Sequence, residues 1–277
     1  MTERGVMAVP TLRMNTGSTI PQIGFGLWRN KDKEECIESV KLALKAGYTH
    51  IDDAQIYENE EFLGQALKEA GAKREDLFIT TKIWNDNMWS DEIDRTFDES
   101  LKKLQTDYVD LLLLHFPVTE LRGAAWRRLQ HIYKDGKAKA IGVSNYTIKH
   151  LEEMKDCEIQ PAVNQVELSV VLQQPELVDY CKANNIVVEA YTPLAEGYFF
   201  KDPTLMEIAK KHGKTVPQIM LRWCIDYGVV VLTKTVHADR IKENFDIFDF
   251  KLDDDDMQKI EGLDQGYRNN WDPTNIP

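Results

Sequence analysis

Eight short apolar stretches recur along the chain, each separated from the next by a segment with helical periodicity. They lie at residues 23–28, 49–54, 77–82, 109–115, 140–145, 162–167, 186–191 and 229–234. Apolar strands that alternate with helices are typical of a parallel sheet with helices on its faces. Eight such units within 277 residues favour closure into a barrel over an open sheet. The sequence therefore predicts an α/β fold, a (β/α)8 TIM barrel, with residues 1–277 forming a single domain.

The segments between the strands, and the segment before the first strand, support this interpretation. The clearest helical faces are Ile37–Val40–Leu44, Phe62–Leu63–Ala66–Leu67 and Ile93–Phe97–Leu101–Leu104. Residues 11–20 differ, because they resemble a β-hairpin that turns at Asn15–Thr16–Gly17. We predict that this N-terminal hairpin caps the bottom of the barrel.

Charge and composition exclude several classes of function. The formal net charge of -12 argues against binding to nucleic acid or to an anionic membrane. The N-terminus lacks the apolar core of a signal peptide and no run reaches membrane-spanning length, so we expect a cytoplasmic protein. The four cysteines form no CxxC pair, which indicates neither a zinc site nor a disulfide framework. We interpret the acidic run 253–256 as a helix start rather than a metal site.

Polar or aromatic residues follow the apolar runs at nearly every predicted strand end. In chain order these residues are Trp28, Asp52, Lys82, His115, Ser144, Asn145, Gln165, Tyr191 and Lys234. Because the carboxyl ends of barrel strands meet at one face and form the active site of such folds, we expect these side chains to gather around one pocket.

Asp52, Tyr57, Lys82 and His115 form a set suited to protonating an oxyanion. A lysine beside Asp52 stays charged even when buried, and that charge would lower the pKa of Tyr57 from its usual value of about 10. Tyr57 could then act as a general acid while His115 donates a hydrogen bond to a carbonyl oxygen. The set offers neither a nucleophile nor electrons, so carbonyl reduction would need an external hydride donor.

The same segments resemble the aldo-keto reductases over nearly the whole chain. The matching motifs include GYTHIDDAQIYENE, ITTKIW, DLLLLHFP, AIGVSN, VNQVE, EAYTPLA and VVVLTKTVHADRIKEN. The resemblance implies a TIM barrel, NAD(P)H as cofactor and a catalytic tetrad of Asp52, Tyr57, Lys82 and His115. The chain is similar to the microbial 2,5-diketogluconate reductase and prostaglandin F synthase branch of the family.

The resemblance also implies a cofactor site. Ser144, Asn145 and Gln165 match the residues that hold the nicotinamide carboxamide, and Tyr191 matches the aromatic residue under the ring. The remaining positions match the pyrophosphate segment (Thr192, Leu194), the 2′-phosphate segment (Lys234, Thr235, Val236, Arg240) and the adenine segment (Glu243, Asn244). Two cations beside a phosphate favour NADPH, and NADH is expected to bind more weakly. The chain has no GxGxxG motif, so a Rossmann domain is not indicated.

The substrate pocket is expected to be apolar and open. Trp28, Trp84 and Phe116 are its predicted walls, and Trp89 is a further candidate. The loop after His115 and the C-terminal tail are short, which favours small aldehydes, ketones or sugar-derived carbonyls as substrates. We expect a monomer whose partner is a small carbonyl compound.

Two other functions fit parts of the pattern. A metal-dependent hydrolase could use His50, Asp52, Asp53 and His115, although Lys82 would repel a divalent ion. A non-catalytic NADPH-binding regulatory barrel would retain Tyr191 and Lys234 but would not need the tetrad. Strand alternation turns Asp53 away from Asp52, so we expect Asp53 to face the helices.

Overall fold

The computed structural model describes residues 9–89 and 92–277. Eight parallel strands close into a barrel in the order β10-β3-β4-β5-β6-β7-β8-β9. The strands are β3 (Ile23–Gly26), β4 (His50–Asp52), β5 (Phe78–Ile83), β6 (Leu111–Leu114), β7 (Ile141–Ser144), β8 (Val163–Glu167), β9 (Val187–Tyr191) and β10 (Val230–Thr233). Each predicted strand segment coincides with one of them, although β5 extends one residue further, to Ile83, so the predicted barrel is confirmed.

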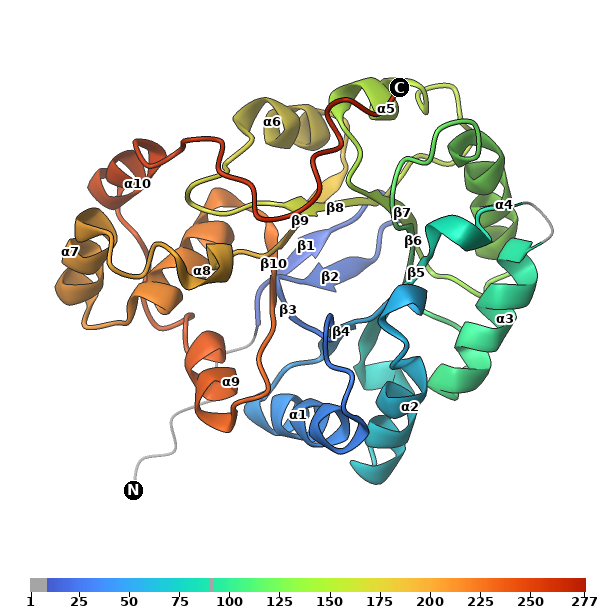
Figure 1. Ribbon diagram of the computed structural model, residues 1–277, viewed down its shortest axis with the longest axis horizontal. Coiled ribbons are helices and arrows are strands. Elements are labelled where there is room, and N and C mark those ends of the chain that lie inside the picture. The colour runs from blue at the N-terminus through green and yellow to red at the C-terminus, as the bar shows by residue number, and fades with distance from the viewer. Residues whose placement is uncertain (1–8, 90–91) are drawn as a thin grey trace.

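Helices surround the strands, as Figure 1 shows. They are α1 (Lys33–Ala46), α2 (Glu60–Glu69), α3 (Glu92–Leu104), α4 (Arg122–Lys134), α5 (Ile148–Glu152), α6 (Pro175–Ala183), α7 (Pro203–His212), α8 (Val216–Tyr227), α9 (Ala238–Phe245) and α10 (Asp254–Glu261). The predicted apolar faces of the first three helices point inward, since Val40, Leu63 and Phe97 are fully buried. Among the described residues, no helix is both long and apolar enough to cross a membrane.

The N-terminal hairpin closes the amino end of the barrel. Strands β1 (Thr11–Arg13) and β2 (Thr19–Pro21) pair antiparallel, and the turn between them includes Gly17 at a φ of 87°. Met14 and Ile20 are buried in one apolar cluster with Phe78 and other residues near the starts of the barrel strands. The predicted hairpin cap is confirmed, and it leaves the opposite end of the barrel free for a site.

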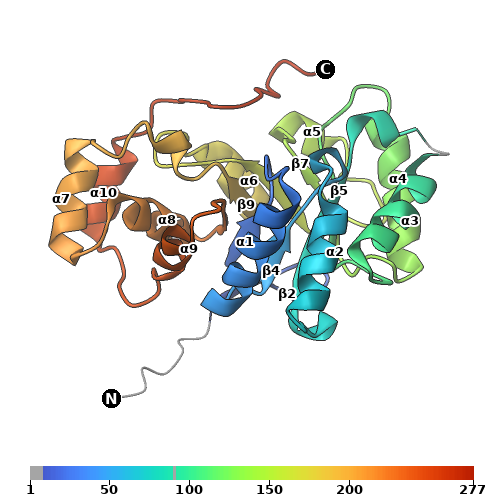
Figure 2. The ribbon, with the colours of Figure 1, turned by 60° about the horizontal axis from the view of Figure 1, so that its bottom comes forward.

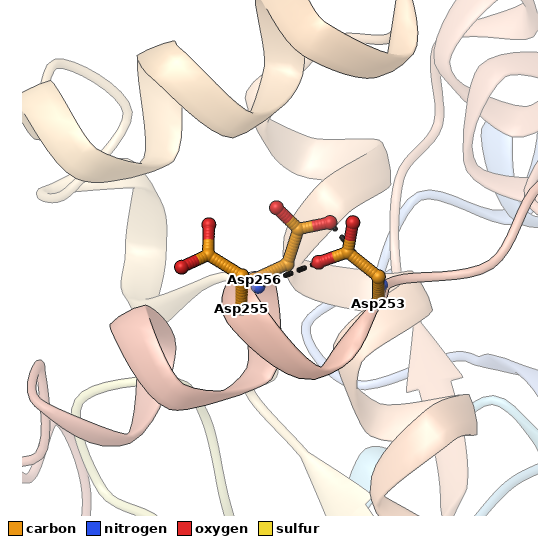
Figure 3. A group of neighbouring side chains, drawn as sticks. All are labelled: Asp253, Asp255 and Asp256. Carbon is orange, nitrogen blue, oxygen red and sulfur yellow. Dashed lines mark hydrogen bonds between the residues drawn. The ribbon is translucent and has the colours of Figure 1, made fainter.

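The acidic run at residues 253–256 starts helix α10. The Asp253 side chain accepts a hydrogen bond of 2.9 Å from the Asp256 amide, as Figure 3 shows. The Lys211 ammonium lies 2.5 Å from Asp253 and 2.8 Å from Asp256, and His212 lies 2.7 Å from the other oxygen of Asp256. These partners use the oxygens that would face an ion, so the geometry agrees with the predicted helix start.

Candidate active site

A cavity of about 590 Å³ opens at the carboxyl ends of the strands. That volume lies within the range of small-molecule and cofactor sites. Thirteen residues predicted from the sequence line it: Trp28, Asp52, Tyr57, Trp84, His115, Phe116, Ser144, Asn145, Gln165, Tyr191, Thr192, Leu194 and Lys234. Lys82 lies beneath the cavity floor and is fully buried. The structure therefore gathers residues from eight strand ends into one site.

The turn after β4 places Tyr57 at the cavity. Asp53 accepts a hydrogen bond of 2.8 Å from the Ala54 amide, and the chain then forms a short 3-10 helix over Gln55–Tyr57. The buried side chain of Asn59 donates to the carbonyl oxygens of Leu27 and Asn30, at 2.9 Å each. These bonds tie the Tyr57 segment to the neighbouring strand loop, because a short polar side chain can satisfy turn carbonyls without regular structure.

Lys82 uses all three of its N–H donors inside the protein. Its Nζ donates to Asp52 Oδ1 at 2.6 Å, to the Asp53 carbonyl oxygen at 2.9 Å and to Tyr57 Oη at 3.2 Å. Burial alone would lower the pKa of Lys82, but Asp52 and Tyr57 raise it above its ordinary value. Lys82 is therefore charged, and because it donates to the Tyr57 oxygen, the phenolic hydrogen is left to point elsewhere.

The predicted lowering of the Tyr57 pKa is wrong in its net direction. Burial raises the pKa of Tyr57 to about 12, and Lys82 opposes this effect without overcoming it. The sequence indicated the charged neighbour but not the depth of the site, and removal of a phenolate from water is the larger effect here. Lys82 thus limits the rise in the pKa of Tyr57 and does not lower it below the ordinary value.

His115 is neutral at the cavity wall. Burial and then the Lys82 charge hold the pKa of His115 well below its usual range. Its Nδ1 is buried without a hydrogen-bond partner among the described residues, and its ring packs edge-on against Tyr57 and Trp84. A neutral imidazole has one N–H, so His115 can donate one hydrogen bond to an oxygen beside Tyr57.

The amide side chains of Asn145 and Gln165 also line the cavity. The Tyr191 hydroxyl donates to Asn145 Oδ1 at 2.6 Å, and the Asn145 amide donates to the His115 carbonyl oxygen at 3.1 Å. Ser144 donates to the Gln165 carbonyl oxygen at 2.8 Å. This network holds the Tyr191 ring and the amides in fixed orientations at the cavity edge.

Of the predicted phosphate and adenine residues, Lys234 lines the edge of the cavity, and the others lie outside it in the segment that follows Lys234. Lys234 and Arg240 are exposed, and within residues 9–89 and 92–277 neither has an ion-pair partner. Glu243 accepts a hydrogen bond of 2.5 Å from Thr215. The other predicted members, Thr235, Val236 and Asn244, are wholly or partly buried between β10 and α9. Two unpaired cations on one rim make it suited to a phosphate.

The residues proposed for a metal-dependent hydrolase do not meet. His50 lies inside the barrel, where its Nε2 is 3.4 Å from Glu189, while Asp53 is buried against the helices and faces Glu60. Asp52 is already held by Lys82. Among the described residues, the acidic or imidazole groups close enough to share an ion are Asp253, Asp255 and Asp256, far along the chain from this set.

The C-terminal tail reaches the cavity, which the sequence did not predict. The buried Glu167 carboxylate accepts from the backbone amides of Asn269 and Asn270 at 2.6 and 2.9 Å. Trp271 packs against Phe116 at 4.5 Å between ring centroids. Figures 1 and 2 show the tail crossing from α10 towards α5 over this face. The expected open pocket therefore has an additional aromatic wall.

Other lining residues were also missed, and one candidate was wrong. The cavity is further lined by Gly26, Arg29, Ile56, Pro193, Glu196, Leu232 and Thr233. Gly26, Leu232 and Thr233 lie in predicted strand segments but were not singled out, whereas Arg29, Ile56, Pro193 and Glu196 lie in segments without a periodic signal. Trp89 is 58% exposed and is not part of the cavity wall.

Glu189 and His50 form a buried pair beneath the cavity that sequence patterns did not identify. Both side chains are fully buried, with Glu189 Oε2 3.4 Å from His50 Nε2. Burial, and then repulsion by Asp52, raises the pKa of Glu189 to about 8. Burial lowers the pKa of His50 to about 4. At neutral pH the pair therefore holds a protonated carboxyl and a neutral imidazole.

Relative to wild type, Glu189→Gln should gain stability as pH rises from about 4.3 to about 8, and we test the upper part of this range, from pH 6.5 to 8. The pKa of the Glu189 carboxyl in the folded protein lies above its unfolded value of about 4.3. The free energy of unfolding of wild type therefore falls as pH rises, until the pH passes the folded-state pKa. A glutamine has no proton to lose. Thermal melts of both proteins should diverge by a few degrees over this window and run parallel above it. A constant difference would contradict the raised pKa.

Comparison with known proteins agrees with this geometry. Residues 22–265 match the model of the aldo/keto reductase family. The chain is 46% identical over 259 residues to glyoxal reductase of Bacillus subtilis, covering 93% of this chain and 94% of that protein. It is 42% identical over 273 residues to methylglyoxal reductase of Escherichia coli, with 96% and 98% covered.

Solved structures of aldo-keto reductases are also similar to this chain. An aldo-keto reductase from a deep-sea metagenome library superposes with a TM-score of 0.93 at 41% identity, covering 97% of this chain and all of that one. An aldo-keto reductase crystallised with NADPH superposes with a TM-score of 0.90 at 35% identity, with 94% and 89% covered.

Proposed function

The chain belongs to the aldo/keto reductase family, and from this premise we propose that it reduces small aldehydes and ketones to alcohols with NADPH, using Tyr57 as the proton donor. Its membership makes it an oxidoreductase that uses NAD(P)H to act on carbonyl groups. The observation that carries the finer proposal is the 3.2 Å contact between Lys82 Nζ and Tyr57 Oη at the wall of the cavity.

The residues at the site fit NADPH. The exposed Lys234 and Arg240 supply positive charge for a phosphate group, and the amides of Asn145 and Gln165 line the cavity where a carboxamide would need partners. The Tyr191 ring, held by its bond to Asn145, offers a flat surface on the same side. Donors, acceptors and an aromatic face are thus arranged for the two ends of one extended ligand.

NADPH, when bound, would supply a hydride for the carbonyl carbon. As the C=O π bond breaks, the oxygen gains electrons and takes the Tyr57 hydroxyl proton, which completes the alcohol. Lys82 stabilises the phenolate that remains, and water returns its proton. His115 donates its N–H to the carbonyl oxygen and holds it beside Tyr57.

A pKa of about 12 does not prevent Tyr57 from acting as this donor. An alkoxide is roughly as basic as hydroxide, whose conjugate acid, water, has a pKa of about 15.7. Proton transfer from Tyr57 to a developing alkoxide is therefore downhill. Because Lys82 opposes the effect of burial, it makes that transfer more favourable than it would be in an uncharged site.

The shape of the cavity favours small substrates. Trp28, Ile56, Trp84, Phe116 and Trp271 give it apolar walls beside the Tyr57 hydroxyl. Small aldehydes and 1,2-dicarbonyl compounds fit such a space, and the relatives named for glyoxal and methylglyoxal reduction support testing these first.

A panel of aldehydes, ketones and dicarbonyls tests the proposal through loss of NADPH absorbance. We expect turnover with several small carbonyls, with the highest kcat/KM among the activated aldehydes. Tight NADPH binding with no turnover on any member would instead support a non-catalytic, regulatory barrel.

Lys234→Ala and Arg240→Ala should weaken NADPH binding about tenfold or more while changing NADH binding little. Each removes a charge-assisted contact that only the 2′-phosphate would make, worth roughly 1.5–3 kcal/mol. The measurement is the dissociation constant of each cofactor by fluorescence titration. Lys242→Ala, at an exposed lysine on the same helix as Arg240, serves as the matched control. Equal losses for both cofactors would argue against the phosphate role.

A further inference from the structure

The amide group of Gln165 is fixed from below by two carboxyl groups. Its Nε2 donates to Asp52 Oδ2 at 2.8 Å and to Glu189 Oε1 at 2.6 Å. Asp52 accepts from the Lys82 ammonium through its other oxygen, so it can only be an acceptor towards Gln165. The Gln165 NH2 must therefore face inward, which leaves Oε1 as the amide atom turned to the cavity.

Glu189 reaches Gln165 because the two residues are paired across neighbouring strands. Gln165 on β8 is in register with Glu189 on β9, and Glu189 lies two residues before Tyr191, so it shares the strand face of Tyr191 one layer deeper. The barrel also makes room for His50, which lies beside Glu189 on the side away from Gln165. A Cβ added at Gly24 would lie 2.8 Å from His50 Nδ1, so a side chain there would displace the imidazole.

The groups around Glu189 determine which of its two oxygens accepts from Gln165. His50 Nδ1 lies 3.4 Å from the Pro21 carbonyl oxygen and donates to it, so His50 Nε2 carries no hydrogen. Nε2 lies 3.4 Å from Glu189 Oε2, but the two atoms do not form a hydrogen bond. The protonated oxygen of Glu189 then faces His50, and its carbonyl oxygen faces Gln165. The other charged groups acting on this pair are Asp52 and Lys82 above it, and Asp110 towards His50.

We propose that Glu189 is a positioning residue for cofactor binding: it accepts from Gln165 Nε2 and thereby holds Gln165 Oε1 towards the cavity, as an acceptor for the N–H of the nicotinamide carboxamide. This inference rests on the proposed function, because it assumes that Gln165 meets that carboxamide. Without the Glu189 acceptor, the Gln165 amide keeps only Asp52 as an inward partner and can rotate. The rotated amide would turn its own N–H groups towards the N–H groups of the nicotinamide carboxamide.

Two substitutions separate this role from a general effect on packing. Glu189→Leu removes the acceptor and introduces an apolar side chain of similar size, whereas Glu189→Gln keeps an oxygen for Gln165 and an N–H that can face His50. The probes are NADPH and the reduced 3-acetylpyridine analogue of NADPH, which carries a methyl ketone in place of the carboxamide and so has no N–H to donate. Binding is followed by fluorescence titration, independently of turnover.

We expect Glu189→Leu to bind NADPH about fivefold more weakly than wild type and to bind the analogue almost as well, while Glu189→Gln retains wild-type affinity for both. Equal losses for NADPH and the analogue in Glu189→Leu, or a loss in Glu189→Gln as large as that in Glu189→Leu, would overturn the proposal. If circular dichroism shows that Glu189→Leu is unfolded, Glu189→Met provides the same test.

Gln165→Leu distinguishes a failure of this inference from a failure of the proposed function. If Gln165→Leu weakens NADPH binding but not analogue binding and Glu189→Leu changes neither, the carboxamide role of Gln165 stands and the role of Glu189 is wrong. If Gln165→Leu itself binds NADPH as tightly as wild type, the assumed cofactor role of Gln165 fails, and the inference fails with it.

Discussion

Tyr57→Phe is expected to lower kcat by about 10²–10⁴-fold while changing the NADPH dissociation constant less than threefold, roughly the effect of one lost weak contact. The substitution removes only the hydroxyl that accepts from Lys82 and faces the cavity. The ring stays in place against His115. Steady-state NADPH oxidation with a small aldehyde and fluorescence titration of NADPH provide the two readouts.

Tyr227→Phe is the matched control for this substitution. Tyr227 lies on α8, where its ring stacks on Trp223 outside the cavity. It should retain wild-type kcat. If Tyr57→Phe also retained near-normal turnover, the assignment of Tyr57 as proton donor would be wrong.

Lys82→Met should cost about 3–5 kcal/mol of unfolding free energy in addition to abolishing turnover. The substitution leaves Asp52 and the Asp53 carbonyl oxygen buried without the donor that now lies 2.6 and 2.9 Å from them. An isolated buried carboxylate is far costlier than a well-packed neutral pair. Urea denaturation should show a lower midpoint with an unchanged slope.

The double variant Lys82→Met, Asp52→Asn identifies the cause of that loss. It removes the orphaned charge and should recover much of the stability, because replacing both members of a buried ion pair is often nearly neutral. It should remain inactive. A double variant no more stable than Lys82→Met alone would indicate that packing, rather than the unpaired charge, explains the loss.

The barrel was predictable because its signal is repeated. Each strand segment is short and apolar, and each is followed by a helical face such as that of Val40 or Phe97, so a mistake about one unit would not change the architecture. The clustering of Asp52, Tyr57, Lys82 and His115 was predictable for a related reason. Asp52, Lys82 and His115 stand at strand ends, and parallel strands bring their carboxyl ends to one face.

Features that depend on depth or on irregular segments were not predictable. The pKa of Tyr57 depends on how completely the folded chain covers it, and no local motif encodes that burial. Trp271 and Asn270 lie in a tail without periodicity, and their placement depends on long-range contacts with Glu167, Thr192 and Phe116. Glu189 resembles an ordinary residue in an apolar strand until the register with Gln165 is known.

The most direct test of the central claim is a solvent isotope effect on a single turnover of enzyme-bound NADPH with a small aldehyde. Conditions are chosen so that NADPH deuterated at the transferred position slows the reaction, which shows that chemistry limits the rate. If Tyr57 delivers its proton as the oxyanion develops, wild type should turn over more slowly in D2O, and the residual turnover of Tyr57→Phe should lose that effect. A wild-type rate unchanged in D2O, or an equal isotope effect in the phenylalanine variant, would contradict the account.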